Sequence, residues 1–363
     1  MLVDLDYFFA QVEEKVNSSL KGKPVVVCVF SGRTEDSGAV STANYLARSY
    51  GVRSGMPIAL AKRKLESTNA VFLPLHYELY EETSERIMAI LAVYADRFEQ
   101  VGIDEAYLDV TQKVYGDFEQ AKALALRIKN EVNAQERLTC SIGIGPNKLI
   151  SKMASVIQKP DGLTVVNPDQ VKSFLSPLLV DQLVGVGTKT KEKMEDLGIR
   201  TIGDLAKFDL ERLFRVFGKK QGIYFHNSAM GVDEDPVKER GETESVSRIS
   251  TLKEDTRDLA VIVDKVNPLC NEIYEEIKQK ELGFKSVGII VVMADMSVHS
   301  RSKTLDNRVQ DLDTFKKTVK ELFGKLLAES EIDVRRVGVK ISSLSREKGK
   351  QEQLESFIDS KSE

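Results

Sequence analysis

Residues 101–110 read Val-Gly-Ile-Asp-Glu-Ala-Tyr-Leu-Asp-Val, a stretch that sets two adjacent acids, Asp104 and Glu105, among apolar residues typical of strands. Residues 1–9 read Met-Leu-Val-Asp-Leu-Asp-Tyr-Phe-Phe and set a third acid, Asp4, in a similar context. Burying an unpaired carboxylate is costly, so buried acids usually have a partner or a metal. The two stretches therefore predict either ordinary charges at strand ends or a carboxylate cluster that binds cations.

The composition favours a multidomain protein that lies outside the membrane. A chain of 363 residues with 42% hydrophobic residues should form more than one core. We see no apolar run of membrane-spanning length and no signal peptide, and we expect a cytoplasmic protein with no membrane partner. The three cysteines are far apart, which argues against a zinc site or a disulfide framework. With a net charge of -4, binding to nucleic acid would need local basic patches.

The order of predicted elements in the first half indicates a βαββαβ sheet with helices on one face. A strand ends at Asp4, and Asp6 is expected to be the N-cap of the helix that follows. The later predicted elements are a helix over 79–98, strands over 100–103 and 106–110, a helix over 118–132, a strand over 138–144, a helix over 149–157 and a strand over 163–166. On such a sheet Asp4 would lie beside the hairpin that carries Asp104 and Glu105.

An insertion after the first helix holds a buried strand over 23–30 and a second candidate site. Residues 38–44 are mostly small and lead into a helix on which Tyr45 and Arg48 lie one turn apart. Small residues allow a ligand to approach the backbone, and both side chains can bind a phosphate. The pair predicts either a phosphate contact or an ordinary exposed helix face.

The pattern changes to short helices over residues 167–232. Gly185 and Gly187 lie between two of them, and Lys189 follows. Glycines at such a turn can point backbone N–H groups at an anion, as a helix-hairpin-helix does when it holds a DNA phosphate. The alternative is a plain loop between helices.

A polar segment, residues 233–243, is predicted to link this region to a second α+β domain of ferredoxin-like order. We expect its strands over 245–251, 285–293, 300–304 and 334–341, with helices over 259–280 and 312–327. Basic residues alternate along one of these strands and lie along another, which predicts either a DNA-binding stripe or solvated edge charges. These residues are Arg301 and Lys303 on one strand, and Arg335, Arg336 and Lys340 on the other.

The charged tail from residue 345 onward is predicted to be disordered. Within it, Leu354, Phe357 and Ile358 would share one face of a helical turn that follows Gln351. Such a turn can anchor in the groove of a partner protein. A frayed tail with chance apolar residues is the alternative.

Taken together, these motifs resemble those of the Y-family, DinB-type translesion DNA polymerases, and most of all their archaeal members. The resemblance covers nearly the whole chain and is most specific in four stretches. These stretches are VDLDYFFA (3–10), ANYLAR (43–48), IDEAYLD (103–109) and SIGIGPNK (141–148), the last with Lys152. One departure is Gly102, where the family usually has Ser.

The resemblance implies an α+β multidomain protein: a ferredoxin-like palm, a fingers insertion, a helical thumb with a helix-hairpin-helix, and a C-terminal α+β little-finger domain. Carried onto this sequence, the palm covers 1–9 and 75–166, the fingers 10–74, the thumb 167–232, the linker 233–243, the little finger 244–344 and the tail 345–363.

The resemblance also implies a role for each candidate residue. Two Mg²⁺ ions would be held by Asp4, Asp104 and Glu105, with the main-chain carbonyl of Leu5 as a further ligand. Phe9 would lie under the incoming sugar as a steric gate against ribonucleotides. The triphosphate contacts fall on Tyr45, Arg48 and Lys159. The implied partners are primer-template DNA, a dNTP and a sliding clamp held by Gln351, Leu354, Phe357 and Ile358, and we expect a monomer.

The resulting hypothesis is template-directed addition of dNMP to a primer 3′ end by two metal ions, in error-prone synthesis past damaged bases. Asp4 and Asp104 would contact both ions, and Glu105 mainly the ion at the primer end. Two alternatives stay open. A nucleotide cyclase uses a related sheet but leaves the hairpin glycines and basic strands unexplained. A catalytically dead DNA-binding scaffold would have no need of the three acids.

Overall fold

The computed structural model describes residues 1–239, 241 and 243–346. The chain divides into two compact units, Met1–Val29 with Ala39–Arg240, and Phe30–Gly38 with Gly241–Glu363. Among the helices of this described part, none combines the length and apolar character needed to cross a membrane.

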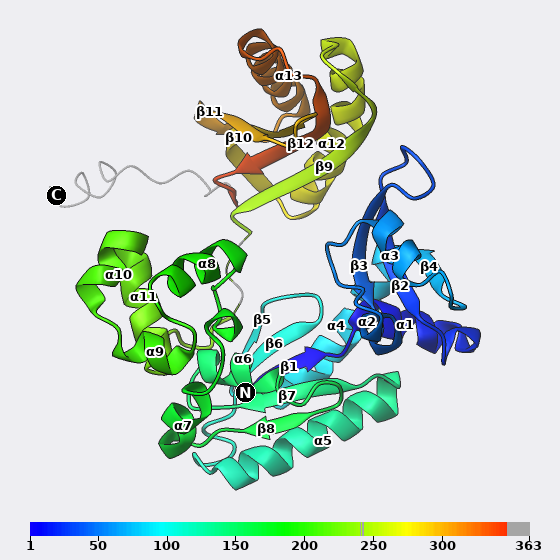
Figure 1. The fold of residues 1–363 in the computed structure, drawn as a ribbon. Coiled ribbons are helices and arrows are strands. Elements are labelled where there is room, and N and C mark those ends of the chain that lie inside the picture. The colour runs from blue at the N-terminus through cyan, green and yellow to red at the C-terminus, as the bar shows by residue number, and fades with distance from the viewer. Residues whose placement is uncertain (240, 242, 347–363) are drawn as a thin grey trace, which may run out of the picture. The chain divides into compact units, whose positions relative to one another are not determined.

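A five-stranded sheet forms the centre of the first unit (Figure 1). Its strands lie in the order β5-β6-β1-β7-β8, so the N-terminal strand is the central one. Their bounds are Leu2–Leu5 for β1, Arg97–Gln100 for β5, Glu105–Asp109 for β6, Cys140–Ile144 for β7 and Leu163–Val165 for β8. Strand β1 runs antiparallel to both neighbours and pairs Asp4 with Glu105 on one side and with Ser141 on the other. The predicted order, and the pairing of Asp4 with the acidic hairpin, are confirmed.

The two faces of this sheet follow from the alternation of side chains along β1. Val3 and Leu5 are buried in a core shared with α4 (Tyr77–Val93) and α5 (Phe118–Glu136). Leu2 and Asp4 point to the other face, which α6 (Lys148–Ser155) covers. A Cβ on Gly143 would lie 2.0 Å from the carbonyl oxygen of Ser151, so only glycine lets α6 pack this closely. The prediction of helices on one face alone is therefore wrong.

Three local predictions around the sheet are also wrong. The helix predicted over 79–98 ends at Val93, because Phe98 pairs with Leu108 in the β5–β6 ladder instead of continuing the helix. The strand predicted over 100–103 is mostly a turn, in which the N–H groups of Val101 and Gly102 donate to the carbonyl of Glu105.

The third error concerns Asp6, which does not cap the first helix. Helix α1 (Phe8–Val16) begins after Tyr7, whose backbone is left-handed (φ 34°) and whose side chain makes no cap bond. The Asp6 carboxylate instead accepts hydrogen bonds from the hydroxyls of Ser141 and Thr139 at 2.7 and 2.9 Å. The buried Asp6 carboxylate thereby links the end of the first strand to β7.

The insertion forms a smaller sheet of order β3-β2-β4, with β2 at Val25–Phe30, β3 at Gly38–Ala43 and β4 at Val71–Pro74. Strand β3 was not predicted: Val40 and Thr42 favour a strand, but the Gly, Ala and Ser residues between and around them do not. The expected helix with Tyr45 and Arg48 is α2 (Tyr45–Ser49), and Asn44 caps it through the N–H of Ala47. A second helix, α3, spans Ile58–Lys64.

Short helices follow the sheet, as predicted (Figure 1). They are α7 (Val171–Leu175), α8 (Thr188–Asp196), α9 (Ile202–Lys207), α10 (Leu210–Phe217) and α11 (Lys219–Ala229). Their buried residues share a core with Leu149, Ile150 and Met153 of α6. Helix α6 therefore packs against the sheet on one side and against the helical region on the other.

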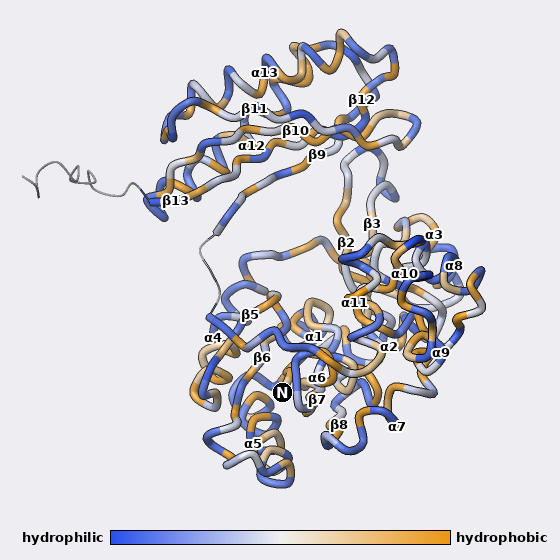
Figure 2. Tube along the Cα trace, turned by 90° about the vertical axis from the view of Figure 1, so that its left-hand side faces the viewer, coloured by the Kyte–Doolittle hydropathy of each residue, from blue (hydrophilic) through white to orange (hydrophobic). Residues whose placement is uncertain are grey.

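The second unit is an antiparallel sheet with two helices, as predicted. The strands lie in the order β11-β10-β12-β9, and β13 (Ser345–Arg346) pairs with β10. The bounds are Ser245–Thr256 for β9, Leu282–Met293 for β10, Val298–Val309 for β11, Val334–Ser342 for β12, Leu259–Gln279 for α12 and Leu312–Glu329 for α13. Orange and blue alternate along α13 in Figure 2, which fits its one buried face.

Candidate active site

The three acids predicted from the sequence lie together at one end of β1. Asp4 is 7% exposed and directly opposite Glu105 in the ladder. Asp104 is in the turn before β6, where its carbonyl accepts a hydrogen bond of 2.8 Å from the N–H of Leu5. This bond closes the end of the β1–β6 ladder and fixes the turn that presents Asp104.

Two lysines pair with these acids. The ammonium group of Lys159 binds Asp4. The ammonium group of Lys152, on α6, binds Glu105 and lies 3.4 Å from Oδ2 of Asp4. Lys159 was predicted as a site residue, whereas Lys152 was noted only as part of a motif and was given no role. No local pattern distinguishes Lys152, because its proximity to the acids depends on how α6 packs on the sheet.

The acids affect one another's protonation. Burial raises the pKa of Asp104, and the charges of Asp4 and Glu105 raise it further, while Lys159 opposes them. Carboxylates that destabilise each other's ionised form are stabilised by a cation between them. The described residues contain no group of three or more His, Cys, Asp or Glu side chains arranged as a ready metal site. The oxygen donors and the excess negative charge nevertheless fit a hard divalent cation such as Mg²⁺.

A cavity of about 210 Å³ opens beside the acids. Six of the predicted site residues line this one cavity, namely Asp4, Leu5, Phe9, Arg48, Asp104 and Lys159. The hydroxyl side chains of Ser41, Thr42 and Ser54 also line it. Ser41 and Thr42 belong to the stretch of small residues, 38–44, that was predicted to let a ligand approach the backbone, whereas nothing in its local sequence distinguishes Ser54.

Phe9 is held by stacking. Its ring lies 4.4 Å from that of Tyr80, centroid to centroid, at an interplanar angle of 14°. Tyr80 is fully buried, and its hydroxyl donates to the carboxylate of Glu13. Tyr80 supports the ring from behind and was not predicted from the sequence.

Arg48 and Tyr45 lie together on α2. The guanidinium carbon of Arg48 is 5.0 Å from the centre of the Tyr45 ring, and its Nε donates to the carbonyl of Ala43 at 2.8 Å. The Tyr45 hydroxyl is buried and has no hydrogen-bond partner in the described structure. A buried hydroxyl left unpaired is costly, which suits a group that waits for a ligand. The pair is therefore not an ordinary exposed helix face.

Gly102 lies against the acidic turn. A Cβ at this position would be 3.3 Å from Oδ1 of Asp104. The serine usual in the family would therefore place its side chain directly beside this carboxylate. In this chain the Asp104 side chain lacks that neighbour.

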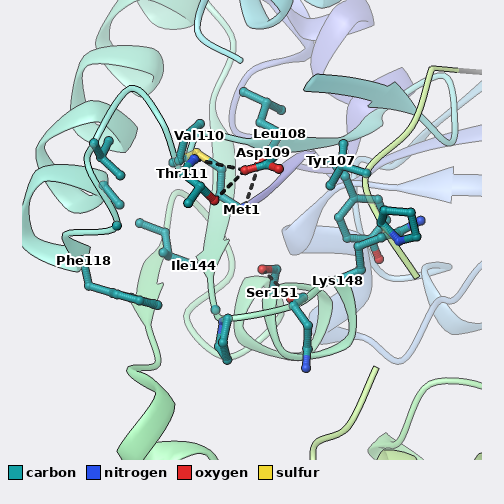
Figure 3. A pocket seen from close by; sticks show the side chains of 18 of the residues that line it. Met1, Tyr107, Leu108, Asp109, Val110, Thr111, Phe118, Ile144, Lys148 and Ser151 are labelled. Carbon is teal, nitrogen blue, oxygen red and sulfur yellow. Dashed lines mark hydrogen bonds between the residues drawn. The ribbon is translucent and has the colours of Figure 1, made fainter. Parts of the chain in front are cut away.

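A larger cavity of about 470 Å³ lies elsewhere in the first unit (Figure 3). Met1, Asp109 and Lys148 are among its lining residues, and none of the predicted site residues is. Lys148 binds Glu99 at 2.9 Å and Asp235 at 2.7 Å, and so holds the start of the linker segment to the sheet. Its role as described is structural.

The two glycines predicted to contact DNA differ in how closely they are packed. Gly185 has φ +87° and lies under the ring of Tyr224, so the turn requires glycine there. Gly187 has open space around it and begins α8, which carries Lys189.

In the second unit, three of the predicted basic residues form ion pairs. Arg301 binds Glu329 at 2.6 Å, and Lys303 binds Glu321 at 3.0 Å. Arg335 lies 3.6 Å from Asp255. Arg336 and Lys340 lie on β12 with the predicted alternation. The predicted clamp contacts, Gln351, Leu354, Phe357 and Ile358, lie outside the described residues.

Comparison with known proteins identifies the family. Residues 3–156 match the impB/mucB/samB family, residues 243–355 match the C-terminal domain of that family, and residues 181–233 match the thumb domain of DNA polymerase-iota. The DNA polymerase IV of Nitrosopumilus maritimus is 46% identical over 351 residues, which are 96% of each chain. That of Methanosarcina acetivorans is 44% identical over 353 residues, again 96% of each chain.

Solved structures agree with the sequence comparison. The Y-family DNA polymerase chimera Dbh-Dpo4(243-245)-Dbh superimposes with a TM-score of 0.90 at 38% identity, over 95% of this chain and 98% of the chimera. The Dbh DNA polymerase in an insertion ternary complex gives a TM-score of 0.69 at 38% identity, with the same coverage. This chain belongs to the impB/mucB/samB family, that of the Y-family DNA polymerases.

Proposed function

We propose that this polymerase extends a primer 3′ end on a template strand with two Mg²⁺ ions held by Asp4, Asp104 and Glu105, and that it acts in synthesis past damaged template bases. The observation that carries the assignment of residues is the cavity shared by Asp4, Asp104, Phe9, Arg48 and Lys159. In this cavity the acids can hold the metal ions, the ring of Phe9 can lie under the sugar, and Arg48 and Lys159 can bind the phosphates. The groups therefore match the parts of a nucleoside triphosphate.

The reaction forms a bond between the primer 3′ oxygen and the α-phosphorus, and breaks the bond from that phosphorus to pyrophosphate. When bound, the Mg²⁺ ions favour loss of the primer hydroxyl proton and neutralise the leaving pyrophosphate. Arg48, Tyr45 and Lys159 orient the triphosphate and take up its charge, because guanidinium, hydroxyl and ammonium groups all donate to phosphate oxygens.

Phe9 selects the sugar. Tyr80 stacks on the Phe9 ring from behind, so the Phe9 ring cannot move back from the cavity without displacing Tyr80. A ribose 2′ hydroxyl would therefore collide with a supported surface. This is the proposed basis of the preference for deoxynucleotides.

The domain division proposed is a palm at 1–9 and 75–166, fingers at 10–74, a thumb at 167–232, a linker at 233–243 and a little finger at 244–344. The match of residues 181–233 to a thumb domain and of 243–355 to a C-terminal domain supports the later boundaries. We further propose that the protein acts as a cytoplasmic monomer, and that residues 345–363 bind a sliding clamp.

The proposed DNA contacts are the turn of Gly185 and Gly187 with Lys189, and the basic residues of β11 and β12. Backbone N–H groups and basic side chains contact phosphates rather than base edges, so binding should be insensitive to sequence. Binding should also weaken steeply with salt, because counterions are released from each neutralised phosphate. A flat salt dependence would contradict these contacts.

One assay tests the proposal against the two alternatives. The protein is incubated with primer-template, dNTPs and Mg²⁺, and both primer extension and cyclic nucleotides are measured. We expect extension by the wild type, none by Asp104→Ala, and equal DNA binding by both proteins. Cyclic nucleotide formation would favour a cyclase, and DNA binding without extension would favour a scaffold. Normal extension by Asp104→Ala would remove the acids from the mechanism.

A further inference from the structure

Both ion pairs that the described structure gives to Lys152 are with proposed metal ligands. Its ammonium group binds Glu105 and lies 3.4 Å from Asp4, and its side chain is only 28% exposed. The neighbouring basic residue on the same face of α6, Lys148, is engaged elsewhere by Glu99 and Asp235. Lys152 is therefore directed at the acids and does not act as a general surface charge.

The charge of the cluster explains what Lys152 does in the metal-free protein. Three carboxylates and the ammonium groups of Lys152 and Lys159 sum to a formal charge of -1. Without Lys152 the same cluster would carry -2 in a partly buried site.

We propose that Lys152 is a positioning residue that holds Asp4 and Glu105 in place when no metal is bound, and competes with a divalent cation for these two carboxylates. This inference rests on the proposed metal site. A cation that binds Asp4 and Glu105 meets the ammonium group already there, and the like charges repel. The ammonium group of Lys152 must therefore move away from the two carboxylates. An incoming triphosphate supplies anionic oxygens with which the displaced ammonium group can pair.

Metal and nucleotide binding are coupled as a result. A metal ion alone has to displace Lys152 without compensation, whereas a metal ion that enters with a triphosphate brings a new partner for the displaced charge. Coupling of this kind is reciprocal, so the nucleotide also binds more tightly when the metal is present. Lys152 thus weakens metal binding at the site until the nucleotide arrives.

The test is a Mn²⁺ titration of the full-length protein without DNA, followed by the electron paramagnetic resonance signal of free Mn²⁺. We expect Lys152→Gln to bind Mn²⁺ about tenfold more tightly than the wild type, because a competing unit charge is removed at close range. Lys122→Gln is the matched control, since it removes the same charge from an exposed position of α5 that pairs only weakly with Glu119. It should bind Mn²⁺ as the wild type does.

Three further measurements keep the proposal open to contradiction. Adding a dNTP should tighten Mn²⁺ binding by the wild type more than by Lys152→Gln. In EDTA, Lys152→Gln should melt at a lower temperature than the wild type, and Mg²⁺ should restore more of its stability. Lys152→Arg keeps the charge and should bind Mn²⁺ no more tightly than the wild type.

The outcomes separate this inference from the proposed function. If Asp104→Asn weakens Mn²⁺ binding but Lys152→Gln binds like the wild type, the metal site stands and the competition by Lys152 is wrong. If Asp104→Asn and the wild type bind Mn²⁺ equally, the proposed metal site itself is wrong. Tighter binding by Lys152→Arg or by Lys122→Gln would also overturn the role of Lys152.

Discussion

Asp4 and Asp6 are two positions apart and both buried, yet their surroundings differ in kind. Asp6 is 0% exposed and accepts hydrogen bonds from the hydroxyls of Thr139 and Ser141 and from the N–H of Asp161. These donors are neutral and fixed by the backbone around them. Asp4 lies between two lysine side chains and faces a cavity together with Asp104.

The difference separates a structural carboxylate, Asp6, from Asp4, which is proposed to bind metal. Neutral fixed donors satisfy Asp6 completely and leave no place for a ligand. Flexible ammonium groups satisfy Asp4 only while nothing better is present, because a lysine side chain can rotate away. A buried acid therefore indicates chemistry when its partners can leave and a cavity lies beside it.

Replacing each of these two aspartates by asparagine should give the largest contrast. Asp4→Asn removes a proposed metal ligand, and primer extension should fall by about 10³-fold, the scale seen when a group that stabilises the transition state is lost. Its free energy of unfolding should change little, because the loss of the ion pairs with Lys152 and Lys159 is offset by relief of the repulsion from Asp104 and Glu105. Steady-state extension and urea unfolding measure the two effects, and a stability loss as large as the activity loss would erase the distinction.

Asp6→Asn should have the opposite signature. The substitution replaces one of the two acceptor oxygens by an NH2 group, which then meets the hydroxyl of Ser141 or the donors of Thr139 and Asp161. The free energy of unfolding should therefore fall by about 2–3 kcal/mol. Per folded molecule, primer extension should stay within a few-fold of the wild type. Urea unfolding of the same preparation gives the stability. A variant that is stable but inactive would mean that Asp6 takes part in the chemistry.

Phe9→Ala tests whether the cavity beside Asp4 selects the nucleotide. Loss of the supported ring should raise the incorporation of ribonucleotides relative to deoxynucleotides by about 10- to 100-fold, as expected for a steric contact worth a few methylene groups. Extension with dNTPs measured alongside NTPs gives the ratio. An unchanged ratio would leave Phe9 as a packing residue for Tyr80.

Glu136 extends the comparison of Asp4 with Asp6, because it is paired with basic side chains, as Asp4 is, but lines neither of the two cavities. It binds Arg86 and Lys15, at 2.7 and 2.6 Å, and its hydrogen bond from Arg86 is the main cause that lowers its pKa below the usual 4.5. Glu136→Gln should reduce the free energy of unfolding by about 1–2 kcal/mol near neutral pH without changing extension.

The pH dependence of that difference follows from the direction of the shift. A carboxyl with a lowered pKa in the folded state contributes stability above its unfolded value of 4.5, and loses it as the pH falls through the folded value. The gap between wild type and Glu136→Gln should therefore close in acid. A gap that is constant over the whole range would mean that charge does not matter at this site.

The sequence was sufficient to predict which acids meet, because element order and side-chain alternation determine the pairing of β1 with the acidic hairpin. It was not sufficient for Asp6, whose partners Thr139 and Ser141 lie more than a hundred residues away, while its local context favours an N-cap. The roles of Lys152 and Tyr80 were missed for the same reason. Their roles depend on how helices and strands pack against each other, and the residue spacing within one helix or strand does not predict that packing.

The central place of β1 has a consequence for biosynthesis. Strand β1 is synthesised well before its neighbours β6 and β7, whose residues Glu105 and Ser141 come about a hundred and about 140 residues later. At a translation rate of about 5–20 residues per second, β1 waits about 7–28 seconds for its second neighbour. During that time its apolar face and both of its edges lack their final partners. The proposed site cannot form until residue 159 of the 363 has been synthesised, so a nascent chain that stops before Lys159 lacks part of the cluster.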